Sequence, residues 1–286
     1  MSKRNLLLGT AAGKVGDLVF YRAGGEQRTR AKVTPNNPKT YAQQAQRSRM
    51  ANVTLMYRAL SALLKDTFTN RKPNQTPFNA FAADALPIAP YLPKSYADEG
   101  KYVLIPALVA KGSIPVPWRD MGCNDENGSV EMNFAAAENP TTIAQLSAAL
   151  IAWRPCCFAE GGAIVFVVIG DHGDNDPGRH QAQFVRIPID TTDTRTLASI
   201  DVRCSTTQKQ GDIDALTVLS VDTGYQSVGF AAVIEKPKSG GGYDVCDARL
   251  LLSTQADETY DEFRTDEKQL EAAISYGGTQ GSCVIV

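Results

Sequence analysis

Residues 17–33 read DLVFYRAGGEQRTRAKV, two extended runs on either side of Ala23-Gly24-Gly25. Adjacent glycines between extended runs favour a β-hairpin, because a tight hairpin turn needs positive φ angles. The second run carries Arg28, Arg30 and Lys32 at alternate positions, so the period of a strand puts all three cations on one face. This stretch therefore predicts an N-terminal hairpin with a basic face.

A long amphipathic helix is expected after the hairpin. Residues 34–40 contain two prolines and two asparagines, which are typical of a turn. From Thr40 to Phe68, apolar side chains recur at steps of three and four, which aligns them along one face of a helix. That stripe consists of Met50, Val53, Tyr57, Leu60, Leu64 and Phe68.

Short strands dominate the sequence after a proline-rich linker. A short helix is expected over residues 77–86, and the three prolines in residues 87–93 then favour an extended linker, so we expect a domain boundary near residue 98. Turn residues separate eight candidate strands further on. These strands are 102–109, 129–135, 163–169, 184–189, 197–204, 215–221, 227–235 and 244–253. Further helices are expected at residues 141–153 and 257–275.

The predicted fold is mainly β with α-helices. A basic hairpin and long helix form residues 1–98, a β-sandwich-like domain forms residues 99–256, and a C-terminal helix and tail form residues 257–286. Hydrophobic residues make up 43% of the chain, which is enough for a sizeable core without a disulfide or metal.

The net charge of −2 conceals a strong asymmetry. Residues 1–72 carry fourteen Lys and Arg against three acids, and the remainder carries 15 against 28. Such a division indicates a basic surface that meets an anionic partner, either nucleic acid or the acidic body of a neighbouring copy. Two regions that merely differ in surface charge remain an alternative. The candidate binding residues are Arg22, Arg28, Arg30, Lys32, Lys39, Arg47 and Arg49.

No pattern in the sequence predicts a catalytic site, a metal or a cofactor. The two histidines lie in residues 171–180, where Asp171, Asp174 and Asp176 suggest a hard-cation site but equally provide the residues that a solvated turn needs. We expect the turn. The cysteines form no C-x-x-C pair. The adjacent residues Cys156 and Cys157 are either a vicinal redox pair or two small buried residues, and we favour the second interpretation.

Two further patterns fall short of a known function. Residues 9–16 resemble a phosphate-binding loop but have the wrong glycine spacing and precede a strand, so we expect a flexible lead-in that approaches a neighbouring backbone closely. The apolar run Leu6-Leu7-Leu8 is too short for a secretory signal, and no stretch is long enough to span a membrane. We therefore expect a protein made in the cytoplasm, without membrane contact.

Several segments of the first 118 residues resemble an uncharacterised domain family common in Bacteroidota genomes and their phages. These segments are GKVGDLVF at 13–20, the Arg-rich run at 26–33, NPKT at 37–40 with Gln43, Gln44 and Arg47, NAF at 79–81 and AKGSIP at 110–115. The NPKT segment is also similar to one in tailed-phage virion proteins. The family has no established activity, so the resemblance implies a phage setting and a non-enzymatic structural role.

Three functional hypotheses follow from the sequence. The first is a self-assembling virion subunit, made in a bacterial host, whose basic arm docks on a neighbouring copy or another virion protein. The second is a nucleic-acid-binding protein that contacts phosphates through the same arm. The third is a cation-dependent protein centred on residues 171–180.

Overall fold

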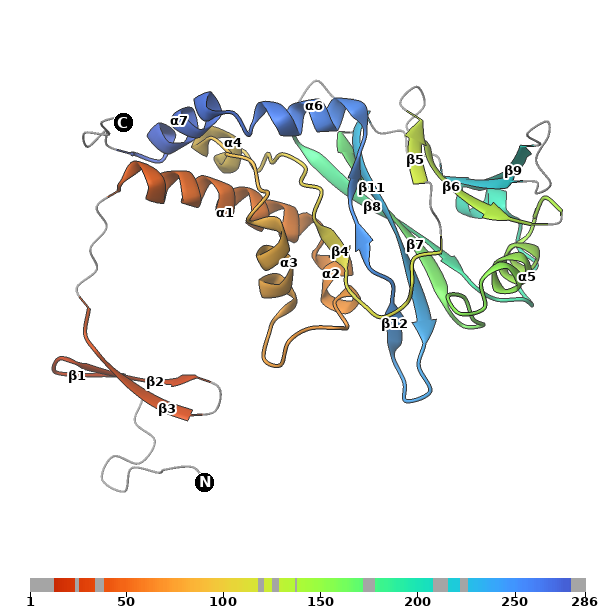
Figure 1. The fold of residues 1–286 in the computed structure, drawn as a ribbon, viewed down its shortest axis with the longest axis horizontal. Coiled ribbons are helices and arrows are strands. Elements are labelled where there is room, and N and C mark those ends of the chain that lie inside the picture. The colour runs from red at the N-terminus through yellow and green to blue at the C-terminus, as the bar shows by residue number, and fades with distance from the viewer. Residues whose placement is uncertain are drawn as a thin grey trace. The chain divides into compact units, whose positions relative to one another are not determined.

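The structure is a computed structural model. It describes residues 13–23, 26–33, 39–117, 121–124, 129–136, 138–171, 178–207, 216–221 and 226–278. Helices make up 33% and strands 34% of these described residues. The predicted fold class is confirmed, since an N-terminal antiparallel sheet precedes a long helix and further antiparallel sheets (Figure 1). The chain divides into two compact units, residues 1–39 and 40–286.

The first unit contains a three-stranded antiparallel sheet. Its strands are β1 (Gly13–Val15), β2 (Leu18–Ala23) and β3 (Glu26–Ala31), in that order across the sheet. Strands β2 and β3 confirm the predicted hairpin, whereas β1 corrects the prediction of a flexible lead-in from Gly13 onward. Gly16, with φ at 58°, makes the tight turn from β1 into β2, a conformation that favours glycine.

The predicted long helix is two helices, α1 (Tyr41–Ala59) and α2 (Ser61–Thr67). The hydroxyl of Thr40 accepts a hydrogen bond from the N–H of Gln43 and so caps α1. The prediction of a single continuous helix was therefore wrong. Helix α1 packs against the C-terminal helix α7 (Asp266–Ser275), whereas α2 packs against strand β4 (Leu108–Ala110). The break at Leu60 lets one apolar stripe reach both surfaces.

Shorter helices complete the α part of the second unit. The helices α3 (Pro77–Ala85) and α5 (Ile143–Trp153) lie where the sequence predicts them. Helix α4 (Lys94–Asp98), which the sequence did not predict, follows directly after the predicted linker. The helix predicted at 257–275 is divided into α6 (Thr254–Glu262) and α7 by a short turn.

Antiparallel sheets form the rest of the second unit. One sheet has the order β5 (Met121–Asn124), β6 (Ser129–Ala135), β10 (Leu216–Val221) and β9 (Val202–Thr207), and η1 (Leu197–Ile200) is a short 3-10 helix before β9. The other has the order β12 (Tyr243–Val245), β11 (Gln226–Pro237), β7 (Ala163–Asp171) and β8 (His180–Pro188), with β14 (Leu251–Leu252) also on β11. Strand β4 pairs with β13 (Ala248–Arg249).

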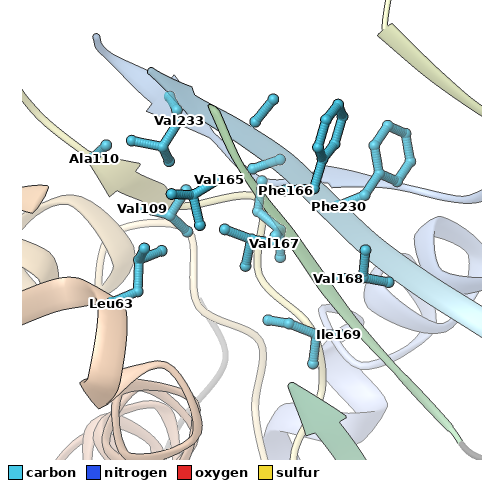
Figure 2. Close-up of a cluster of buried hydrophobic side chains, with 14 of the residues drawn as sticks. Leu63, Val109, Ala110, Val165, Phe166, Val167, Val168, Ile169, Phe230 and Val233 are labelled. Carbon is cyan, nitrogen blue, oxygen red and sulfur yellow. The ribbon is translucent and has the colours of Figure 1, made fainter. Parts of the chain in front are cut away.

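Strand β7 is the centre of the core. Its apolar run is buried along almost its whole length, as expected of a strand covered on both faces. Figure 2 shows Val165 and Val167 on the side of Leu63 and Val109, and Phe166 on the opposite side near Phe230. Because successive side chains of β7 point to opposite faces, the strand packs against other elements on both of its sides. The helices and the sheets therefore share one hydrophobic core.

This shared core explains why the predicted boundary near residue 98 falls inside the second unit. The apolar sides of α1, α2 and α3 are buried in the same cluster as β7 and β11. The strand predicted at 102–109 is also shorter than expected, because its ladder pairing begins only at Leu108.

Candidate partner-binding surface

The register of the N-terminal sheet gives it one cationic face. Lys14 of β1 pairs with Val19 of β2, and Val19 pairs with Arg30 of β3. Tyr21 pairs with Arg28 in the next row of the same face. Directly paired residues of antiparallel strands point to the same side of a sheet, so Lys14, Arg28 and Arg30 share one face with Tyr21.

The contacts on the cationic face are weak and exposed. The guanidinium of Arg30 lies 5.7 Å from the ring centroid of Tyr21. The guanidinium of Arg28 lies 3.8 Å from the carboxylate of Glu26, and these side chains are 56% and 77% exposed. An ion pair this exposed contributes little stability, so its groups can exchange it for contacts with a partner at small cost. Lys32 continues the ladder, since its N–H donates to the carbonyl of Asp17 at 2.6 Å.

The opposite face of the same sheet is largely apolar. Val15, Leu18 and Ala31 form one row across the three strands, and Phe20 lies in the next. Phe20 is buried, whereas Val15 and Leu18 are 68% and 46% exposed. Arg22, paired with Gln27, also lies on this side. The side that carries Val15, Leu18 and Arg22 is therefore distinct from the cationic face.

The structure separates the seven predicted binding residues. Arg28 and Arg30 share a face with Lys14, which the sequence did not single out, while Arg22 lies on the other face. Lys39 precedes the cap of α1 with φ at 47°. Arg47 and Arg49 belong to α1 and thus to the second unit.

Both candidate arginines of α1, Arg47 and Arg49, take part in contacts within the second unit. The Nε of Arg49 donates to the carbonyl of Ala89 at 2.9 Å, and its Nη2 donates to that of Pro87 at 2.6 Å. Its guanidinium also lies 5.5 Å from the ring centroid of Tyr91. Arg47 donates to the side-chain oxygen of Gln44 at 3.2 Å. The role of Arg49 is therefore to hold the 87–91 segment against α1.

Asp171 and His180 form a buried pair where β7 ends and β8 begins. The Nδ1 of His180 lies 2.8 Å from Oδ1 of Asp171, with side chains only 6% and 16% exposed. The ring of Tyr102 meets the imidazole edge-on, with centroids 5.0 Å apart. Burial, and to a smaller extent the charge of Asp171, raises the pKa of Tyr102. His180 is thus part of the folded interior, which corrects the expectation of a solvated turn residue.

A cavity of about 240 Å³ adjoins this pair and is also lined by Glu262 and Lys268. Asp174, Asp176 and His172 lie outside the described residues. Within the described ranges, no three His, Cys, Asp or Glu side chains are grouped so that they could hold a metal ion. The contact between Asp171 and His180 therefore stabilises the end of the β7–β8 hairpin.

Replacing Asp171 with alanine is expected to lower the free energy of unfolding by about 2 kcal/mol, because it leaves His180 buried without its carboxylate. Urea titration would measure the change. Replacing both residues should cost less than the sum of the two single changes. Strict additivity would contradict a direct interaction between the side chains.

A second cavity, of about 530 Å³, lies between β5–β6 and β13–β14 and includes Arg249. That guanidinium donates to the carbonyl of Pro106 at 2.6 Å and to the carboxylate of Asp84 at 3.0 Å. These bonds connect β13 to α3 and the 101–107 segment, so Arg249 has a structural role here.

Comparison with known proteins identifies no relative. The sequence matches no protein-family model and no curated protein, and the fold matches no solved structure. Among the helices of the described segments, none combines the length and apolar character that crossing a bilayer requires.

Proposed function

We propose that this chain is a non-enzymatic assembly subunit whose N-terminal sheet docks on a second copy of the chain. The observation that carries the proposal is the cationic face of that sheet, formed by Lys14, Arg28 and Arg30. The resemblance of residues 9–118 to a phage-associated family makes a tailed-phage virion, assembled in a bacterial host, the setting that we propose.

Charge supplies the attraction between copies. Residues 1–39 carry eight Lys and Arg against two acids, whereas residues 40–286 carry 21 against 29. Opposite net charges on the two units favour a head-to-tail contact, in which the sheet of one copy binds the body of the next. Such contacts close into rings or extend as filaments.

The small size of the sheet supports docking as well. Three short strands make a marginally stable structure when one face is not covered. Binding of the cationic face to a second copy would cover one face of this sheet. A partner surface therefore stabilises the sheet while the sheet connects the two copies.

The test compares Arg30→Glu with Arg22→Glu in the full chain, with mass measured by light scattering. The two substitutions change the net charge equally but lie on opposite faces of the sheet. We expect a nuclease-resistant oligomer at low salt that Arg30→Glu weakens at least about tenfold in protein concentration, equivalent to about 1.4 kcal/mol. Arg22→Glu should weaken it much less.

Two outcomes would reject this function. A chain that stays monomeric at all concentrations in low salt has no self-assembly to explain. Equal weakening by Arg30→Glu and Arg22→Glu would mean that total charge matters and the cationic face does not.

Nucleic-acid binding is the second candidate function, and Tyr21 favours it. Its ring shares a face with Lys14, Arg28 and Arg30, and the Arg30 guanidinium lies 5.7 Å from the ring centroid. Aromatic rings stack on bases while Arg and Lys neutralise phosphates. This function predicts a mass that rises only when single-stranded DNA is added, with affinity that falls steeply with salt and falls again in Tyr21→Ala.

A further inference from the structure

Two adjacent cysteines occupy a tight turn that follows α5. The N–H groups of Cys157 and Phe158 both donate to the carbonyl of Arg154, at 3.0 Å each, which fixes the turn. The Sγ atoms of Cys156 and Cys157 lie 3.5 Å apart. Cys156 is exposed, whereas Cys157 is buried and its thiol donates to the carbonyl of Pro115 at 3.2 Å.

Two cations, Lys236 and Arg154, lie at this turn. The ammonium of Lys236, on β11, donates to the carbonyls of Pro155 and Cys156 at 3.2 and 2.8 Å. The guanidinium of Arg154 lies 5.4 Å from the ring centroid of Trp153. The two bonds from Lys236 therefore hold the backbone of the turn in place.

The two thiols are suited to different roles. Burial, reinforced by the neighbouring Cys156 thiol, raises the pKa of Cys157 to about 11, and the charges of Arg154 and Lys236 only partly offset this. Cys157 is therefore protonated and inaccessible at neutral pH. Cys156 is the thiol that an oxidant in solution can reach.

We propose that Cys156 and Cys157 form an oxidation site that closes reversibly into a vicinal disulfide. The oxidant is a hydroperoxide, of which hydrogen peroxide is the simplest. The Cys156 thiolate attacks one peroxide oxygen and the O–O bond breaks, which gives a sulfenic acid and a hydroxide that takes up a proton to become water.

The thiol of Cys157 then closes the disulfide. Its sulfur attacks the sulfenic sulfur of Cys156, the S–O bond breaks, and the departing oxygen takes the thiol proton and leaves as a second water. In sum, two thiols lose two electrons to the peroxide and give one disulfide and two waters. The short distance between the sulfurs makes this second step faster than attack by a thiol in solution.

Ring closure is expected to loosen the turn. Adjacent Cα atoms lie about 3.8 Å apart, closer than the usual distance across a disulfide, so the ring is strained and easily reduced. The bond from Cys157 to the carbonyl of Pro115 is lost when its sulfur joins Cys156. Oxidation therefore weakens the contact between this turn and the 115–117 segment.

The experiment treats the reduced full chain with hydrogen peroxide and maps the cysteine peptides by mass spectrometry. We expect the peptide with Cys156 and Cys157 to lose two hydrogen atoms and to regain them after reduction. Cys204 and Cys246 serve as internal controls, because burial raises the pKa of their thiols to about 12 and about 11, and both should remain reduced.

Two variants separate the proposed roles. In Cys157→Ser, Cys156 should still form a sulfenic acid, which dimedone traps, but no disulfide within the peptide. In Cys156→Ser, Cys157 should remain a thiol under the same conditions. Conversion of wild-type Cys156 to sulfinic or sulfonic acid while Cys157 stays free would overturn the proposal, as would a disulfide between two chains.

Discussion

Replacing Asn52 with alanine is expected to lower the free energy of unfolding by about 3–5 kcal/mol. Asn52 is fully buried in α1. Its Nδ2 donates to the carbonyl of Val103 at 3.1 Å, and its Oδ1 accepts from the N–H of Val103 at 2.9 Å. The side-chain amide of Asn52 thus pairs with both the N–H and the C=O of Val103, as a residue of a neighbouring strand would. Alanine removes both bonds and leaves a cavity.

Asn79→Ala is the matched control for this substitution. Asn79 is exposed in α3, so removing its amide should change stability by no more than about 0.5 kcal/mol. Urea titration of both variants, with the slope compared as well as the midpoint, would measure the difference. Similar losses in the two variants would show that the N–H and C=O of Val103 find other partners when Asn52 is absent.

The sequence predicted the elements whose signals are local. Alternating Arg28 and Arg30 placed two cations on one face of a strand, and the register confirms that they share it. The apolar stripe from Val53 to Phe68 likewise identified the buried side of the helical region, although packing against two different elements breaks that helix at Leu60.

What the sequence could not predict depends on pairing between distant residues. Lys14 joins the cationic face only because β1 pairs with β2 in this register. Arg49 looked like a free cation, but the carbonyls that it binds belong to Pro87 and Ala89. The sequence analysis did not single out Asn52, because its partner lies 51 positions further along the chain. The periodicity of the sequence does not predict such contacts, because they depend on how whole helices and strands pack together.

The segment 111–114 illustrates the same limit and carries the second large prediction. Replacing Gly112 with alanine is expected to cost about 3 kcal/mol or more. A Cβ at this position would lie 1.9 Å from the carbonyl oxygen of Val245 and 2.6 Å from its carbonyl carbon. These are backbone atoms of β12, so no side-chain rotation relieves the overlap.

The neighbouring hydrogen bonds prevent the segment from moving away. The N–H of Gly112 donates to the carboxylate of Asp247 at 2.9 Å, and the N–H of Ile114 donates to the carbonyl of Val245 at 3.1 Å. A shift large enough to admit the methyl group would lengthen both bonds. The expected loss therefore combines steric overlap with weakened pairing to β12.

Gly240→Ala separates this close approach from the general effect of replacing a glycine. Gly240 lies in the turn before β12, and a Cβ there would meet no atom within 4 Å. Because alanine restricts the unfolded chain more than glycine does, Gly240→Ala should leave stability unchanged or raise it by up to about 1 kcal/mol. Urea titration of both variants gives the comparison. If Gly112→Ala changed stability as little as Gly240→Ala, the prediction would be contradicted. Residues 111–114 could then move away from β12 without disturbing the core that α2, β4 and β7 share.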